Sequence, residues 1–269
     1  RRVPGDGFTW PFEYNHEIKY MKKILIQAIT SEIGFSLANY WLDKGVKVYG
    51  TFRNESEELE KLIARGVIVC KCDLTDKKSI ELCIVWLAEN GVWDVMVIGA
   101  GSQPPIGRFL DVEFDDWETS VHANFIGQFR FVQKALKFRN LEDNNIPVVL
   151  FFAGGGTNNA TLNYSAYTIS KIATMKMCEL LDAEILDTSF TILGPGWVGT
   201  KIHQATLKAG EQNAGENYHK TKFMLENDQC FSMEKVVECC DWLVNSKRAL
   251  ISGRNFSAVN DPWQDQKIN

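Results

Sequence analysis

Strand-length apolar runs alternate with helix-length amphipathic stretches from residue 22 almost to the end of the chain. Strands are predicted at 22–28, 46–52, 67–73, 95–100, 148–154, 190–194 and 250–259. Helices are predicted between them at 33–44, 56–65, 77–90, 114–138 (as one helix or two), 165–186 and 232–245. Such alternation with short connections is typical of a parallel sheet with helices on both faces. We therefore expect an α/β fold built on a single Rossmann-like, doubly wound parallel β-sheet.

Two segments interrupt this alternation. Residues 1–20 hold two prolines, two glycines and no sustained periodicity, so we interpret them as an N-terminal extension or linker, a vector-encoded remnant, or the end of a preceding domain. Residues 21–269 are predicted to form one domain. Residues 201–230 are polar and weakly periodic, and we expect them to form a mobile flap beside a substrate site.

Composition excludes several functional classes. The formal charge of −5 is spread along the chain without a basic stripe, which argues against nucleic-acid binding. The apolar runs are shorter than the roughly 18 residues of a membrane helix, so we predict no membrane partner. Seven irregularly spaced cysteines indicate reduced thiols and a cytoplasmic protein. Cys70 and Cys72 have no second pair at zinc-ligand spacing, so no metal site is predicted.

Ligands of open parallel sheets bind beyond the carboxyl ends of the strands. The first such turn spans residues 27–34, where Thr30 and Ser31 supply hydroxyl groups at the start of a helix. Free N–H groups there suit a pyrophosphate, although an ordinary capped helix explains the same residues. The fourth strand ends in Gly99-Ala100-Gly101, which permits either close approach of a flat ligand or a simple tight turn.

Two charged residues follow the second and third strands. No acidic residue follows the second strand to bind the ribose hydroxyls of NAD, whereas Arg53 is placed to pair with the 2′-phosphate of NADP. A solvated surface arginine is the alternative. Asp73 ends the third strand, where it either touches an adenine or caps the next helix together with Thr75.

A tyrosine–lysine pair opens the helix that follows the buried strand at 148–154. Tyr167 and Lys171 are four residues apart and so share a helix face. A nearby ammonium favours the phenolate and is expected to lower the tyrosine pKa, which would suit proton exchange with a carbonyl or alcohol oxygen. Tyr218 and Lys222 have the same spacing but follow no strand, so we interpret them as chance or as part of the flap.

In this order and spacing the residues resemble the short-chain dehydrogenase/reductase family, of which the chain looks like a divergent member, over about residues 22–262. The family's Tyr-x-x-x-Lys is similar to Tyr167 and Lys171, and its helical asparagine is similar to Asn124. The family's Pro-Gly segment, which holds the nicotinamide carboxamide, resembles residues 194–200. Residues 252–263 are similar to the closing strand of some bacterial members.

The resemblance implies an NAD(P)-dependent oxidoreductase that transfers hydride between a nicotinamide cofactor and a small carbonyl or alcohol substrate. It implies that Tyr167 is the acid/base, that Lys171 lowers its pKa and binds the nicotinamide ribose, and that Asn124 helps hold a water in a proton relay. NADP(H) is favoured over NAD(H), and a homodimer or homotetramer is expected. The expected cofactor contacts are Ala28, Thr30, Ser31, Ile33, Gly34, Arg53, Asp73, Leu74, Ala100, Gly101, Tyr167, Lys171, Pro195, Gly196, Val198 and Thr200.

The chain departs from the family pattern at several positions. The first-turn motif Thr-Gly-x-x-x-Gly-x-Gly is here Gln27, Ala28, Glu32 and Gly34, so only its last glycine remains. Glu32 puts a carboxylate where pyrophosphate charge is expected, which weakens cofactor binding unless the side chain turns outward. The family's asparagine after the fourth strand is here Gly99.

The family's catalytic serine also has no counterpart at its expected positions, which hold Ala153 and Gly154. Thr157 and Ser165 are nearby hydroxyls that do not match by position. Losing one donor to the reacting oxygen costs roughly 10²–10³ in rate, which slows an enzyme without abolishing its activity. The alternatives are therefore a catalytically impaired relative that acts as a cofactor sensor or partner subunit, and a plain flavodoxin-like binding module.

Overall fold

The computed structural model describes residues 22–156 and 159–263, so the predicted extension at 1–20 lies outside the described residues. Its strands are β1 (Lys23–Gln27), β2 (Lys47–Phe52), β3 (Ile68–Lys71), β4 (Val95–Ile98), β5 (Val148–Phe152), β6 (Ser189–Gly194) and β7 (Arg254–Ser257). They form one sheet in the order β3-β2-β1-β4-β5-β6-β7, and each neighbouring pair is parallel. The strand order reverses between β1 and β4. The predicted doubly wound sheet is confirmed.

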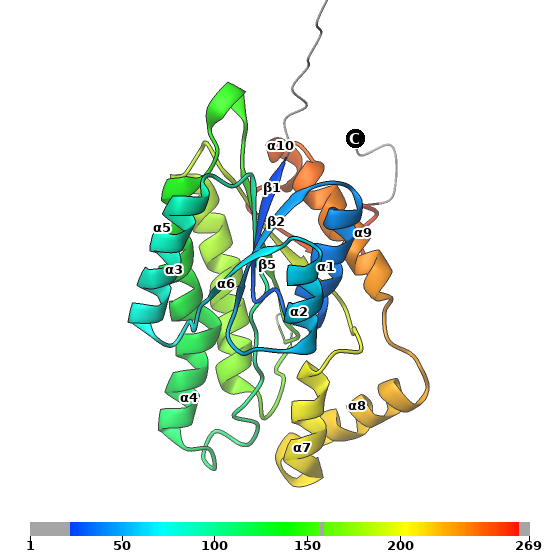
Figure 1. Cartoon of the computed structure of the whole chain (residues 1–269). Coiled ribbons are helices and arrows are strands. Elements are labelled where there is room, and N and C mark those ends of the chain that lie inside the picture. The colour runs from blue at the N-terminus through cyan, green and yellow to red at the C-terminus, as the bar shows by residue number, and fades with distance from the viewer. Residues whose placement is uncertain (1–21, 157–158, 264–269) are drawn as a thin grey trace, which may run out of the picture.

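Helices cover both faces of the sheet (Figure 1). One face packs against α1 (Glu32–Asp43), α2 (Glu57–Ala64) and α9 (Met233–Asn245), and the other against α3 (Lys77–Asn90), α5 (Gly127–Ala135) and α6 (Ser165–Glu184). Strand residues alternate between the two cores. Ile24 and Ile26 belong to the α1 side and Leu25 to the α6 side. Burial on both faces explains why these strands are apolar without a polar alternation.

Helices α1, α2 and α3 begin at side-chain caps that the sequence offers. Ser31 Oγ accepts a hydrogen bond from Gly34 N at 3.1 Å at the start of α1. Ser56 does the same for Leu59 N at the start of α2, and Asp76 for Lys78 N at the start of α3. Each cap satisfies an N–H group that has no partner within its own helix. Ser31 thus caps α1 as the sequence predicted.

Three predicted segments differ from the structure. Residues 114–138 form α4 (Phe114–Val121), a π-helical turn at His122–Ile126 and α5, followed by a short 3₁₀ turn at Leu136–Phe138. The polar segment 201–230 folds into α7 (Ile202–Ala214) and α8 (Glu216–Glu226). The strand predicted at 250–259 is α10 (Arg248–Ile251) and the shorter β7. Gly253 separates them at φ +71°, a conformation outside the β region.

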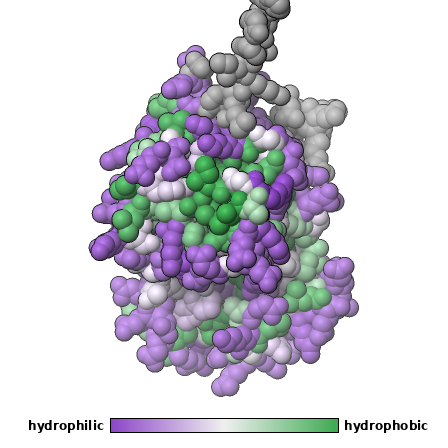
Figure 2. All heavy atoms as spheres, viewed as in Figure 1, coloured by the Kyte–Doolittle hydropathy of each residue, from purple (hydrophilic) through white to green (hydrophobic). Residues whose placement is uncertain are grey.

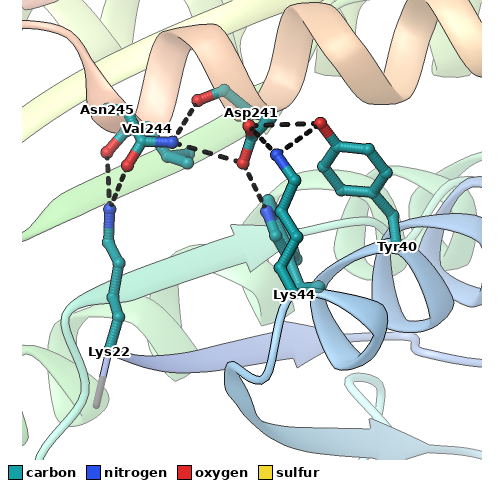
Figure 3. Close-up of polar contacts among 7 residues, drawn as sticks. Lys22, Tyr40, Lys44, Asp241, Val244 and Asn245 are labelled. Atoms are coloured by element: carbon teal, nitrogen blue, oxygen red, sulfur yellow. Dashed lines mark hydrogen bonds and ion pairs between the residues drawn. The ribbon is translucent and has the colours of Figure 1, made fainter.

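A polar cluster joins α1 to α9 (Figure 3). Asp241 on α9 accepts hydrogen bonds from Trp41 Nε1 at 2.8 Å, Tyr40 Oη at 3.2 Å and Lys44 Nζ at 2.7 Å. Burial raises the pKa of Asp241, but the hydrogen bonds from Lys44 and Trp41 outweigh it, so the pKa lies below its usual value. Because Trp41 is buried, Asp241 supplies the acceptor that its indole N–H needs.

The outer surface carries both hydrophilic and apolar side chains (Figure 2). Figure 2 shows mostly hydrophilic side chains on one face, around a central group of apolar ones. Within the described ranges, no helix combines the length and apolarity needed to cross a bilayer. All seven cysteines are free thiols, and five of them are buried.

Candidate active site

A cavity of about 1240 Å³ opens at the carboxyl ends of the strands, between the sheet and α7–α8. The structure brings ten of the predicted contacts together on its wall. They are Ser31, Ile33, Ala100, Gly101, Tyr167, Lys171, Pro195, Gly196, Val198 and Thr200. The other predicted residues lie outside this lining. They are Ala28, Thr30, Gly34, Arg53, Asp73, Leu74 and Asn124. The wall is thus continuous from the first turn to the tyrosine on α6.

Tyr167 and Lys171 lie in the first two turns of α6 and face the cavity. Lys171 is buried, and its Nζ donates a hydrogen bond to the carbonyl of Phe152 at 3.0 Å. The same Nζ lies 5.7 Å from the centre of the Tyr167 ring. A Cβ placed on Gly101 would be 3.8 Å from it, so the ammonium lies between the ends of β4 and β5. The predicted pairing of phenol and ammonium is therefore present.

The protonation of this pair differs from the expectation drawn from spacing. Burial raises the pKa of Tyr167 to about 12. Burial also lowers the pKa of Lys171 to about 8. The net shift of the Tyr167 pKa is therefore upward and not downward as expected from the spacing, because burial removes water from the phenolate.

Gly154 is one of the two positions where the family's serine is expected, and the phenol of Tyr167 fills the space beside it. A Cβ built on Gly154 would lie 2.9 Å from Tyr167 Oη and 2.8 Å from Lys171 Cγ. A side chain here would have to displace one of them. Ala153 is buried in the core on the α6 face of the sheet. Of the two nearby hydroxyls, Ser165 Oγ accepts a bond from Trp117 Nε1 at 3.0 Å, and Thr157 lies outside the described residues.

Asn124 lies in the π-helical turn and is buried. Its Oδ1 accepts a hydrogen bond from Ser102 N at 2.9 Å, and its Nδ2 donates to Ser102 O at 2.8 Å and to Ser120 Oγ at 3.2 Å. The carboxamide therefore pins the loop after β4 to the helix. Its geometry makes Asn124 a positioning residue for the cavity wall, and π-helical turns recur at functional sites.

Two buried glutamines hold the end of β4. In the sequence, Gln27 stands out only as a departure from the family motif, and Gln128 does not stand out. Gln27 Oε1 accepts a hydrogen bond from Ala100 N at 3.1 Å, and Gln128 Nε2 donates to Ala100 O at 3.0 Å. A Cβ on Gly99 would lie 2.9 Å from Gln27 O, so glycine is needed where the family has asparagine. A polar residue at the end of an apolar strand was the available signal, since buried amides need partners.

The first turn keeps the family's backbone path with different residues. Ala28 takes a left-handed conformation at φ +59°, which explains why the family places glycine at this position. A Cβ on Gly34 would lie 2.7 Å from Ala28 O, so this glycine cannot be replaced without a shift. Glu32 opens α1, and its Oε1 accepts a hydrogen bond from the backbone N–H of Lys201 at 2.7 Å. Glu32 therefore reaches across to the segment after β6.

The residues expected near the adenine lie beyond the main cavity. Asp73 Oδ1 accepts hydrogen bonds from Thr75 N at 2.9 Å and Thr75 Oγ1 at 2.7 Å. Burial raises the pKa of Asp73, but the bonds from Thr75 and the charge of Arg53 outweigh it and lower the pKa. The link to Thr75 is thus as predicted, although the residue that caps α3 is Asp76. Arg53 is exposed beside Asp73.

The second tyrosine–lysine pair lies on α8. Tyr218 packs its ring edge-on against His219, and Lys222 pairs with Glu226 at 3.8 Å. Neither Tyr218 nor Lys222 lines the cavity. The two tyrosine–lysine pairs therefore have the same spacing but different surroundings, because only Tyr167 and Lys171 line the cavity.

Comparison with known proteins gives the same assignment over most of the chain. A family model described as Enoyl-(Acyl carrier protein) reductase matches residues 28–258. The chain belongs to the short-chain dehydrogenase/reductase family. It is 23% identical over 240 residues to an uncharacterized oxidoreductase of Schizosaccharomyces pombe, covering 87% of this chain and 94% of the relative. It is 27% identical to an NADP-dependent 3-hydroxy acid dehydrogenase of the same yeast, covering 77% and 83%.

Solved structures of the family share the fold. A short chain dehydrogenase/reductase from Saccharomyces cerevisiae superposes with a TM-score of 0.78 at 23% identity, covering 90% of this chain and 97% of the other. An actinorhodin polyketide ketoreductase with NADPH superposes with a TM-score of 0.75 at 21% identity, covering 88% and 95%. The family uses nicotinamide cofactors and acts on small molecules. By fold and by sequence, the chain is therefore an oxidoreductase of this family.

Proposed function

We propose that the protein is an NADP(H)-preferring reductase of a small carbonyl substrate, with Tyr167 as the acid/base. The observation that carries this proposal is the pair of Tyr167 and Lys171 on the wall of a cavity that also includes the first turn and the segment 194–200. Gly101 leaves space beside the pair, since the nearest atom to a Cβ placed on it would be Lys171 Nζ at 3.8 Å.

The proposed reaction divides between cofactor and chain. A bound nicotinamide supplies or accepts the hydride at the substrate carbon, because no side chain can do so. In reduction, the Tyr167 hydroxyl donates its proton to the carbonyl oxygen, which completes the alcohol. Lys171 holds positive charge beside the phenol and is placed to bind a ribose hydroxyl. Asn124 keeps the loop after β4 in position and, as a further prediction, helps hold a water of the proton relay.

The raised pKa of Tyr167 predicts how the rates of reduction and oxidation depend on pH. Burial raises this pKa to about 12, so the hydroxyl is protonated at neutral pH. Carbonyl reduction needs a protonated phenol, whereas alcohol oxidation needs the phenolate. We therefore expect the rate of alcohol oxidation to rise with pH throughout the alkaline range, and carbonyl reduction to proceed at neutral pH.

Arg53 supports the preference for NADP(H). It is exposed at the end of β2, and a guanidinium there pairs well with a 2′-phosphate. Two similar proteins, an NADP-dependent 3-hydroxy acid dehydrogenase and a polyketide ketoreductase with NADPH, support this preference. Arg53→Glu is expected to weaken NADPH binding at least tenfold and to leave NADH binding nearly unchanged. An equal effect on both cofactors would contradict the role of Arg53.

A catalytically impaired cofactor sensor or partner subunit is the second candidate. Gly154 in place of a serine and the Glu32–Lys201 bond favour it, because the first removes a donor to the substrate and the second places an anion near the pyrophosphate site. The two candidates differ in turnover and agree in cofactor binding.

The experiment is a titration with NADPH and NADH, followed by turnover assays. Eight tryptophans make fluorescence quenching a suitable binding signal. A panel of ketones, sugars and acyl substrates then tests turnover, and binding without turnover favours the second candidate. Tyr167→Phe is expected to abolish turnover and to keep cofactor affinity. Tyr218→Phe is the matched control, since it removes a phenol of the same spacing outside the cavity. Retained activity in Tyr167→Phe would refute the assigned role.

Assembly and location complete the proposal. Ile169 and Ile172 on α6 and Ile126 in the π-helical turn are exposed apolar side chains, and they support a homodimer or homotetramer. Light scattering of the purified protein tests this assembly. Seven free thiols support a reducing, cytoplasmic environment.

A further inference from the structure

Glu32 lies between the beginnings of two helices. It is the first residue of α1, and its carboxylate accepts the N–H of Lys201, the residue immediately before α7. N–H groups at the beginning of a helix lack intrahelical partners, and the helix dipole there favours negative charge. A single carboxylate therefore stands where a helix beginning would otherwise receive an external anion.

The segment that Glu32 contacts is held by further bonds. Lys201 Nζ lies 3.5 Å from Glu58 Oε1 on α2. The rings of Trp197 and His203 stack with their centres 3.7 Å apart. Burial lowers the pKa of His203, against the opposing charge of Glu32, which places this imidazole near the same carboxylate. Residues 197–203 are thus tied to the first turn of α1, and they lead directly into α7.

An incoming cofactor would meet this carboxylate. The pyrophosphate of a dinucleotide is expected at the beginning of α1, where Ser31, Glu32 and Ile33 line the cavity. Like charges in contact repel strongly at the edge of a protein, where solvent screens them only in part. The pyrophosphate and the Glu32 carboxylate therefore cannot share the site in the arrangement that the structure shows.

We propose that Glu32 is an internal competitor of the cofactor pyrophosphate, and that cofactor binding breaks its bond to Lys201 and so releases the segment that leads into α7–α8. This inference rests on the proposed function, since it concerns the same cofactor. It makes Glu32 a residue that sets cofactor affinity. It also links cofactor binding to the two helices that cover the substrate cavity.

Two variants of Glu32 separate its charge from its hydrogen bond. Glu32→Gln keeps the length and an acceptor for Lys201 N but removes the charge, and Glu32→Gly removes both. Hydrogen bonds to charged groups are strong, and NADPH must break one in the wild type. We therefore expect NADPH to bind roughly ten- to a hundredfold more tightly to Glu32→Gly than to the wild type, and to Glu32→Gln with an intermediate affinity. Glu234→Gln is the control, because it removes the same charge from the first turn of α9 outside the cavity lining.

The binding assay is NADPH titration of the full-length protein by tryptophan fluorescence, at one fixed salt concentration. Hydrogen exchange supplies an independent readout without cofactor. The amide of Lys201 is expected to exchange faster in Glu32→Gly than in the wild type, and saturating NADPH is expected to produce the same acceleration in the wild type. Thermal unfolding by circular dichroism verifies that each variant is folded.

The outcomes distinguish this inference from the proposed function. Wild-type binding with no tighter binding in either Glu32 variant would overturn the inference and leave the proposed function intact. NADPH binding by Glu32→Gly and not by the wild type would support the inference. It would show that the Glu32 carboxylate keeps the cofactor out of the wild-type site. Failure of every variant to bind NADPH or NADH would overturn both, because removal of the carboxylate would have exposed no site.

Discussion

Replacing Lys171 by methionine tests the energetics of the site without knowledge of the substrate. The side chain is 4% exposed, and burial lowers its pKa from 10.5 to about 8. A pKa lowered in the folded state means that the unfolded chain binds the proton more strongly. The corresponding cost of burying the ammonium is about 3 kcal/mol at neutral pH.

The sign of the pH dependence follows from this shift. Between about pH 8 and pH 10.5 the unfolded chain keeps a proton at Lys171 that the folded chain has lost, so folding stability rises with pH. From about pH 7 to about pH 9.5 this one group should add about 2 kcal/mol to the free energy of unfolding. Lys171→Met lacks the titrating group and loses that increase. It also loses the bond to the Phe152 carbonyl, which costs about 1–3 kcal/mol at every pH in this range.

Urea denaturation at several pH values, followed by circular dichroism, measures the difference between wild type and variant. Taking the difference cancels the thiols and other groups that titrate in both proteins. Lys176→Met is the control, because Lys176 is exposed on the same helix and pairs with Glu179. A wild-type-to-Lys171→Met difference that stays constant from neutral to alkaline pH would refute the assignment of a buried, easily deprotonated lysine.

Two further substitutions test the backbone of the site. Ala28→Gly should raise the free energy of unfolding, measured by urea denaturation, by up to about 1 kcal/mol. Alanine at φ +59° costs about 1–2 kcal/mol, and the greater chain entropy of unfolded glycine cancels part of the gain. Ala38→Gly, inside α1, should instead destabilise the protein, and equal effects of the two substitutions would contradict backbone strain at Ala28. Gly154→Ser should reduce turnover at least tenfold, because the new Cβ would displace the phenol of Tyr167, whereas Gly155→Ser, with no atom within 4 Å of its Cβ, should leave turnover nearly unchanged. Restored or increased activity in Gly154→Ser would show that the missing serine can be accommodated after all.

The fold was predictable because each element carries its own local signal. The helix at 77–90 has its predicted bounds, since Asp76 caps its beginning and Gly91, at φ +94°, ends it. The strand predicted at 250–259 is shorter in the structure, for a reason that local sequence patterns do not reveal. Gly253 packs against Asp182, from a helix far away in the sequence, and the chain becomes a strand only after it. The π-helical turn likewise has no periodicity of its own to detect.

The sequence predicted part of the lining of the candidate site and did not predict the energetics of its charged groups. The spacing of Tyr167 and Lys171 placed both groups on one helix face, and their order relative to the strands placed them at the cavity. Spacing does not show how much water each group retains in the folded protein. The loss of that water raises the pKa of Tyr167 and lowers the pKa of Lys171. Burial depends on residues such as Gly154, whose missing side chain admits the phenol.

The departures from the family pattern form two groups with different consequences. Gly99 and Gly154 are compensated inside the structure, since Gln27 approaches the first and the Tyr167 phenol occupies the space beside the second. Ala28 and Glu32 are not compensated in this way, because one retains an unfavourable backbone conformation and the other brings a charge to the expected anion site. On the proposed function, the first group keeps the phenol at the cavity wall, and Glu32 in the second group weakens the hold on the cofactor. On the inference drawn above, Glu32 exchanges cofactor affinity for control of the segment that leads into α7–α8.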